Sequence, residues 1–124
     1  DMPTPTRLKR IADRIQQEMA EMMVLGEISD PRLVGISITD VTVDRELSYA
    51  DIFVSCLEGQ VREEEIMQGL ESARGFLRKQ LSNRIELRSF PQLRFHWDLT
   101  PEKADRIEQL LDKIKTEKVK GKLK

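Results

Sequence analysis

The sequence predicts an α+β domain in which helices cover one face of a single three-stranded sheet. Two observations predict this class: apolar residues recur three or four positions apart in some segments, and they alternate with polar residues in others. Along the chain these patterns give the order helix, strand, strand, kinked helix, strand, helix. A chain of 124 residues is long enough to bury one hydrophobic core, and we expect a single domain over residues 1–114.

Composition excludes several classes of protein. The chain is 39% hydrophobic and 35% charged, and its apolar residues fall in periodic clusters, which argues against a disordered chain. No apolar run approaches the roughly 18 residues of a membrane span, and no signal-peptide pattern opens the chain. Asp1 precedes Met2, which we expect to be the natural start. The single cysteine, Cys56, leaves no disulfide and no thiol cluster, so we expect a cytoplasmic protein without a metal or another cofactor.

The first predicted helix begins after Thr4 or Thr6 as its cap, with Pro5 in the first turn. Its apolar stripe consists of Leu8, Ile11, Ile15, Met19 and Met22. Beside this stripe, Arg7, Arg10 and Arg14 share one flank at helical spacing. The flank is either an ordinary solvated basic face or a surface that meets phosphate groups.

The connection to the first strand contains Gly26, which ends the helix, and the motif Asp30-Pro31-Arg32-Leu33. Pro31 fixes its own φ and favours extended geometry at Asp30, so we expect a rigid entry into the strand. Arg32 could reach a phosphate or pair with a neighbouring carboxylate, and the sequence leaves both open.

Two strands follow as an antiparallel hairpin with a short connection. Apolar positions change phase between Ile38 and Val41 in the first strand, so we expect a bulge or a strand end at Asp40. The second strand covers residues 49–56, and its predicted inner face consists of Ala50, Ile52, Val54 and Cys56. Cys56 is expected to be a buried apolar residue, since no histidine partner is near it in sequence.

The long helix after the hairpin has an apolar stripe of Ile66, Leu70, Ala73, Leu77 and Leu81. Gly75 interrupts it at a cost of about 1 kcal/mol relative to alanine, so we expect a kink there. Phe76 either plugs this kink or meets a base, and we favour the plug. Basic residues lie at and beyond this point: Arg74, Arg78, Lys79, Arg84 and Arg88. The kink could expose N–H groups beside these residues and hold a phosphate backbone; an ordinary amphipathic helix with a tolerated glycine is the alternative.

The remaining chain predicts a third strand, a last helix and a tail. The strand covers residues 93–99 and alternates Leu93, Phe95, Trp97 and Leu99 with polar residues, among them His96, which we expect to be an ordinary surface residue. Thr100 and Pro101 begin the helix, whose inner stripe consists of Ala104, Ile107, Leu111 and Ile114. Residues 115–124 carry five lysines against one glutamate, and we expect a disordered tail that adds nucleic-acid attraction or only solubility.

Four short motifs carry a resemblance to a known family. The element order with a kinked helix is similar to that of a type II KH domain, but Ala73-Arg74-Gly75 stands where KH domains have a Gly-x-x-Gly loop. The other motifs are Asp30-Pro31-Arg32-Leu33, Leu47-Ser48-Tyr49-Ala50 and Pro91-x-Leu93-x-Phe95. With these motifs in this order, the chain resembles the ribosome-binding factor A family from about Arg7 to Ile114.

The resemblance implies a bacterial, non-enzymatic assembly factor that binds the free small (30S) ribosomal subunit. Such factors assist late maturation and processing of the 5′ end of 16S rRNA and are linked to growth in the cold. It implies a monomer without a membrane or a small-molecule substrate, and recognition of rRNA shape with little base reading. The candidate RNA-binding residues are Ala73, Arg74, Gly75, Arg78, Lys79, Arg84, Arg88, Arg7, Arg10 and Arg32.

Other classes of function fit the sequence less well. An enzyme is disfavoured because the chain has no histidine pair, no metal-ligand cluster, no P-loop and no nucleophile with a nearby base. A protein-interaction module that docks through the acidic segment 58–65 or through the last helix is an alternative. A general binder of single-stranded RNA is a further one, and it should bind short unstructured oligonucleotides.

Overall fold

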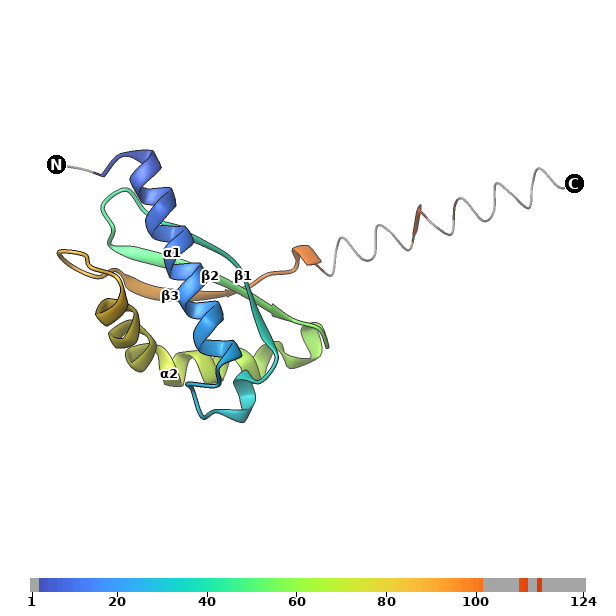
Figure 1. Cartoon of the computed structure of the whole chain (residues 1–124). Helices are drawn as coiled ribbons and strands as arrows, with labels where there is room; N and C mark the ends of the chain where they lie inside the picture. Colours follow the sequence, from blue (N-terminus) through green and yellow to red (C-terminus); the bar gives the residue numbers. More distant parts are fainter. Residues whose placement is uncertain (1–2, 102–109, 112–113, 115–124) are drawn as a thin grey trace, which may run out of the picture.

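The computed structural model describes residues 3–101, 110–111 and 114. Over this part of the chain the predicted order is confirmed up to the third strand (Figure 1). The elements are α1 (Pro5–Val24), the 3₁₀ turn η1 (Pro31–Leu33), β1 (Ile36–Val43), β2 (Tyr49–Cys56), the 3₁₀ turn η2 (Gln60–Arg62), α2 (Glu63–Arg84) and β3 (Gln92–Trp97).

The three strands form one sheet in the order β1-β2-β3. β1 and β2 pair antiparallel, as the hairpin prediction requires, and their register shifts between Ile38 and Asp40, which confirms the predicted bulge. β2 and β3 pair parallel, with Tyr49 opposite Gln92, and α2 is the connection between them. The result is a mixed sheet of the KH-like α+β class.

α1 and α2 pack against the same face of the sheet, α1 on β1 and α2 on β3 (Figure 1). The predicted inner face of β2 is confirmed: Ala50, Ile52 and Val54 are fully buried. Cys56 is also buried, as predicted, and this burial raises the pKa of its thiol above its ordinary value. The core therefore lies between the sheet and these two helices.

The predicted ends of α1 are confirmed. Thr4 is the N-cap, and its hydroxyl oxygen accepts a hydrogen bond from the Arg7 backbone N–H at 3.1 Å, followed by Pro5 in the first turn. Beyond Val24 the chain reverses at Gly26, whose φ of +65° is a conformation that glycine adopts without strain.

α2 is assigned as helix without interruption from Glu63 to Arg84, and in Figure 1 its yellow-green and ochre parts run in different directions, as the predicted kink requires. Gly75 lies on the exposed side of this helix. Phe76 is 44% exposed, so the prediction that it plugs the kink is wrong. One residue turns a helix by about 100°, which points Phe76 away from the buried side that the next residue, Leu77, occupies.

The C-terminal part departs from the prediction in two further places. β3 ends at Trp97 rather than Leu99, because the Asp98 carboxylate turns the chain by accepting the Thr100 backbone N–H at 2.9 Å, and Leu99 is exposed. The last helix and the tail lie mainly outside the described residues. Of its predicted inner stripe, Leu111 and Ile114 are described and are 52% and 48% exposed, so the prediction that they face the core is wrong. The sheet face is already covered by α1 and α2.

Candidate nucleic-acid interface

A cleft of about 820 Å³ lies where the start of α1, the turn between β1 and β2, and the segment that leads into β3 meet. We call it the basic cleft; its polar lining includes Arg7, Ser48, Arg78, Arg88, Ser89 and Gln92. Glu46 is the acidic residue in its lining. A smaller cavity of about 370 Å³ adjoins it through Arg7 and Leu87 and adds Arg10, Arg14 and Glu86.

Arg7 reaches the basic cleft from the first turns of α1. The backbone N–H groups at a helix start carry partial positive charge, and no acidic residue in the first turn of α1 offsets it. Arg7 and Arg10 are both exposed and lie three positions apart, so they share one flank of the helix. This flank therefore presents positive charge to the two adjoining hollows.

Arg78 forms the α2 wall of the basic cleft and also has a structural role. Its Nη2 donates to the Phe90 carbonyl oxygen at 2.6 Å, and its Nε donates to the Pro91 carbonyl oxygen at 3.1 Å. These bonds hold the segment before β3 against α2. Because both acceptors are neutral carbonyls, the positive charge of Arg78 adds to the potential of the cleft.

The turn between β1 and β2 forms another wall of the basic cleft and has an unusual backbone. Leu47 has a φ of +55°, which is rare for a bulky residue. Two hydrogen bonds to Asp44 hold this turn: the Leu47 N–H donates to its carbonyl oxygen at 3.0 Å, and the Tyr49 N–H donates to its carboxylate at 2.7 Å. A third bond, from the Gln92 N–H to the Ser48 carbonyl oxygen at 2.9 Å, joins the turn to β3. The wall is thus fixed in position.

Four predicted residues of α2, Ala73, Arg74, Gly75 and Lys79, do not line the basic cleft; on α2 the residue that does is Arg78. Arg74 is four residues before Arg78 and so lies on the same flank of α2; its contact is an exposed ion pair with Glu71 at 3.4 Å. Such exposed pairs contribute little, so a phosphate could replace Glu71 at small cost. Gly75 and Lys79 are exposed on the outer side of the helix, and Ala73 is half-buried.

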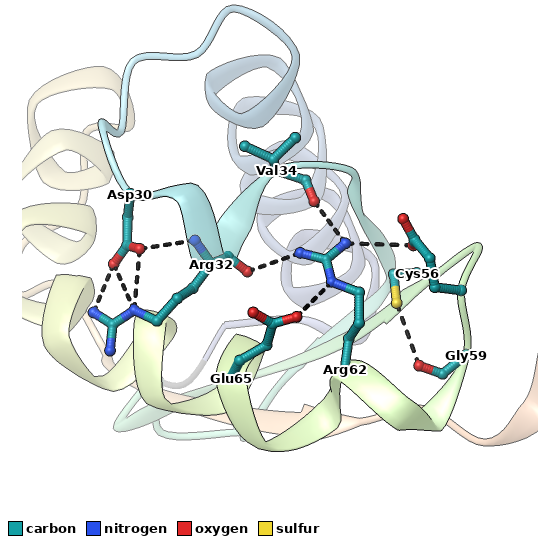
Figure 2. A network of polar contacts seen from close by, with 8 residues as sticks. Asp30, Arg32, Val34, Cys56, Gly59, Arg62 and Glu65 are labelled. Atoms are coloured by element: carbon teal, nitrogen blue, oxygen red, sulfur yellow. Dashed lines mark hydrogen bonds and ion pairs between the residues drawn. The ribbon is translucent and has the colours of Figure 1, made fainter.

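Two predicted residues lie elsewhere and have carboxylate partners. Arg84 joins α2 to α1 and the chain after it, with Nη2 2.5 Å from Glu27 and Nη1 3.4 Å from Glu18; Glu27 is the larger cause of its raised pKa. Arg32 pairs with Asp30 at 2.7 Å (Figure 2), so the structure favours the carboxylate over the phosphate for this side chain. Neither guanidinium lines the basic cleft.

The structure thus brings together Arg7, Arg10, Arg78 and Arg88 from three separate parts of the chain. Sequence reasoning placed Arg14 beside them but omitted Arg14 from the candidate set, and missed the polar groups of Ser48, Ser89 and Gln92. The alternation in β3 indicates that Gln92 is on the polar side of the strand. Nothing in the sequence indicates that it meets the turn between β1 and β2, because that depends on the parallel pairing of β3.

Two other features are absent from the residues that the structure describes. Among those residues, no group of three or more His, Cys, Asp or Glu side chains could hold a metal ion. Within the same ranges, none of the helices combines the length and the apolar character that crossing a bilayer requires.

Proteins of known family show what this chain is similar to. The ribosome-binding factor A of Chromohalobacter salexigens is 44% identical over 108 residues, which cover 86% of this chain and 82% of that protein. The ribosome-binding factor A of Alcanivorax borkumensis is 41% identical over 112 residues, which cover 90% of this chain and 81% of that protein.

Solved structures show the same fold. The crystal structure of ribosome-binding factor A from Thermus thermophilus matches with a TM-score of 0.64 and 21% identity, over 73% of this chain and 93% of that chain. A homology model of the Thermus thermophilus factor, fitted into a cryo-EM map of a 30S–RbfA complex, matches with a TM-score of 0.59 and 23% identity, over 71% of this chain and 91% of that chain. The sequence model for ribosome-binding factor A matches residues 7–111. The chain therefore belongs to the ribosome-binding factor A family.

Proposed function

We propose that this chain is an assembly factor that binds the free small ribosomal subunit as a monomer in the bacterial cytoplasm. In this proposal it assists late maturation and processing of the 5′ end of 16S rRNA, and it acts by binding rather than by catalysis. Two observations support it: the relatives are named ribosome-binding factors, and the Thermus factor was fitted into a map of a 30S complex.

The observation that carries the RNA contact is the convergence of Arg7, Arg78 and Arg88 on the basic cleft. Guanidinium groups suit phosphate because they donate paired N–H groups in a fixed plane. The hydroxyl groups of Ser48 and Ser89 can donate further hydrogen bonds to phosphate oxygens. Such contacts read the path of the RNA backbone and carry little base sequence.

The mechanism we propose is that of a rigid wedge. The domain holds rRNA elements in a conformation that delays premature use of the subunit, and it leaves when maturation removes its site. The hydrogen bonds from Arg78 to the segment before β3, together with the fixed turn at Leu47, would keep the cleft walls from yielding to the RNA.

Charge reversal in the basic cleft tests the RNA contact. Arg7→Glu combined with Arg88→Glu should weaken co-sedimentation with purified free small subunits at least about tenfold, because two phosphate contacts become repulsive. Both side chains are exposed, so the domain should remain folded. The slope of log K against log salt should become shallower by roughly 0.7–0.9 for each phosphate that the protein no longer neutralises.

Lys9→Glu is the matched control, because Lys9 lies on the same helix and its contact is an exposed ion pair with Asp13 at 2.7 Å. It should change binding much less than the double variant. Unchanged binding of a folded Arg7→Glu/Arg88→Glu protein would remove the basic cleft from the proposal. Equal binding of the parent protein to free subunits and to complete ribosomes would instead indicate a general RNA binder.

A further inference from the structure

The end of the molecule opposite the basic cleft exposes several large aliphatic side chains. α1 is about 30 Å long, and the basic cleft lies at its start whereas these residues lie around its end, η1 and η2 (Figure 1). They are Val24, Leu25, Val34, Leu57 and Val61. Leu57 is fully exposed, and Val24 and Val61 are each 85% exposed. A gathering of exposed aliphatic groups at one end is typical of an interaction surface.

An apolar groove of about 400 Å³ lies within this end of the molecule. Its lining includes Met22, Met23, Val24, Ile28, Leu33 and Val34. Asp30 is its charged member, and the Asp30 carboxylate already pairs with Arg32. The groove can therefore accept an apolar side chain without leaving a buried charge unpaired.

Arg62 fixes the chain segments around these residues (Figure 2). Its guanidinium donates to the carbonyl oxygens of Val34 at 2.8 Å and Arg32 at 3.2 Å, and it pairs with Glu65 at 2.8 Å and Glu58 at 3.3 Å. The Arg62 side chain is only 16% exposed, whereas its carboxylate partners Glu58 and Glu65 are 54% and 48% exposed. The contacts of Arg62 join the segment before β1 to the start of α2, which sets the surface before any partner arrives and lowers the entropy cost of binding.

The charged groups beside these aliphatic residues are mainly acidic. The carboxylates are those of Glu58, Glu63, Glu64 and Glu65, and Arg62 offsets part of their charge. We call the five aliphatic residues and these four glutamates the apolar–acidic surface. Phosphate groups would be repelled there, which argues against nucleic acid as its ligand.

We propose that the apolar–acidic surface binds a basic polypeptide segment in which apolar side chains alternate with lysine or arginine. An apolar side chain of the segment would fill the groove beside Val34, and its cationic groups would pair with the carboxylates at the start of α2. The occupant follows from charge complementarity, which selects partners and sets their orientation more than it adds affinity. This surface shares no residue with the basic cleft, so the proposal does not depend on the proposed function.

The test uses the full, isotope-labelled chain and a short synthetic peptide of alternating lysine and leucine. Two matched peptides, one of glutamate and leucine and one of lysine and serine, separate the contributions of charge and apolar groups. The lysine–leucine peptide should shift the amide resonances of residues 22–36 and 57–65. It should bind at least about tenfold more tightly than either matched peptide.

Two variants assign the binding to this surface. Leu57→Ser combined with Val61→Ser should weaken peptide binding about fivefold or more, because the surface loses apolar area that the peptide would bury. Both residues are exposed, so the core should be unaffected. Glu64→Lys should weaken binding of the lysine–leucine peptide and make that binding less dependent on salt. Phe76→Ser, at an exposed aromatic residue about four helical turns from the start of α2, is the control and should leave the affinity unchanged.

Several results would overturn the proposal. These are shifts confined to the basic cleft, equal binding of the glutamate–leucine peptide, or a Leu57→Ser/Val61→Ser protein that binds as the parent does. Two others would assign the surface to a different occupant. Amide shifts in residues 57–65 when Lys118, Lys120 and Lys122 are changed to glutamine would identify the chain's own basic segment. Shifts that grow with protein concentration, without peptide, would identify a second copy.

Discussion

Two glycines in α2 have opposite environments, and a single methyl group distinguishes them. A Cβ on Gly69 would lie 2.9 Å from Leu33 Cδ2 and 3.2 Å from Arg32 Cβ, so η1 can approach α2 only because Gly69 has no side chain. A Cβ on Gly75 would meet nothing within 4 Å. The packing glycine of this helix is therefore Gly69, which sequence reasoning did not single out, and no steric contact requires glycine at position 75.

Alanine at these positions should change stability in opposite directions. Gly69→Ala should lower the free energy of unfolding by about 1–3 kcal/mol, because η1 must move away. Gly75→Ala should raise it by about 1 kcal/mol, because alanine favours helix. Urea unfolding followed by circular dichroism measures both. If Gly75→Ala weakens subunit binding while it stabilises the fold, the glycine at Gly75 serves RNA recognition.

Arg62 is a second residue whose role depends on distant parts of the chain. In sequence it is one basic residue in an acidic segment, and only the fold brings the carbonyl oxygens of Arg32 and Val34 to it. Arg62→Ala should lower the free energy of unfolding by about 1–3 kcal/mol, because the carbonyl oxygens of Arg32 and Val34 lose a charged donor that joins two segments of the chain. Glu64→Ala, at an exposed position two residues later, is the comparison and should change it far less. Equal losses in the two variants would contradict this role.

At the scale of elements, the outer face of the sheet carries a polar cluster that joins β2 to β3. Arg94 Nε lies 2.8 Å and His96 Nε2 lies 2.7 Å from Asp51 Oδ1, and the Arg94 guanidinium lies 4.1 Å from the centre of the Tyr49 ring. Phe53 stacks on His96 with ring centres 5.0 Å apart. Arg94 is the main cause that holds the pKa of Asp51 below its ordinary value, and His96 contributes less.

This cluster should make the parallel strand pair sensitive to acid. The pKa of Asp51 is lower in the folded state than in the unfolded state. Its contribution to the free energy of unfolding is therefore complete above the unfolded-state pKa of about 3.9 and is lost as the pH falls through the lower folded-state pKa. Asp51→Asn should lower the free energy of unfolding by about 1 kcal/mol at pH 7. Below about pH 3 the free energies of unfolding of the variant and the parent should become more alike. Urea unfolding across this range measures it.

Asp13→Asn removes an exposed carboxylate of α1 and should have little effect at either pH. A constant difference between the Asp51→Asn protein and the parent from pH 7 to below pH 3 would contradict the assignment of acid sensitivity to Asp51.

At the scale of the whole molecule, local patterns predicted the elements, but they did not predict how distant elements meet. Periodicity identified the stripe of α1, the inner face of β2 and the bulge before Asp40, because each depends on neighbouring residues. The walls of the basic cleft depend on β3 lying parallel to β2, which no local pattern encodes. Phe76 was misplaced although local periodicity puts it off the buried side of α2, because the next residue, Leu77, occupies that side.

The separation of charge along α1 also affects how the molecule meets a partner. Arginines gather near the start of this helix, and the glutamates of the apolar–acidic surface lie toward its other end, so the described part of the chain has an electric dipole. In the field of a polyanion this dipole experiences a torque that turns the basic cleft toward the polyanion before contact, although a net charge of −1 by itself gives weak repulsion. The fraction of productive collisions, rather than their number, would then fall as salt shortens the range of the field.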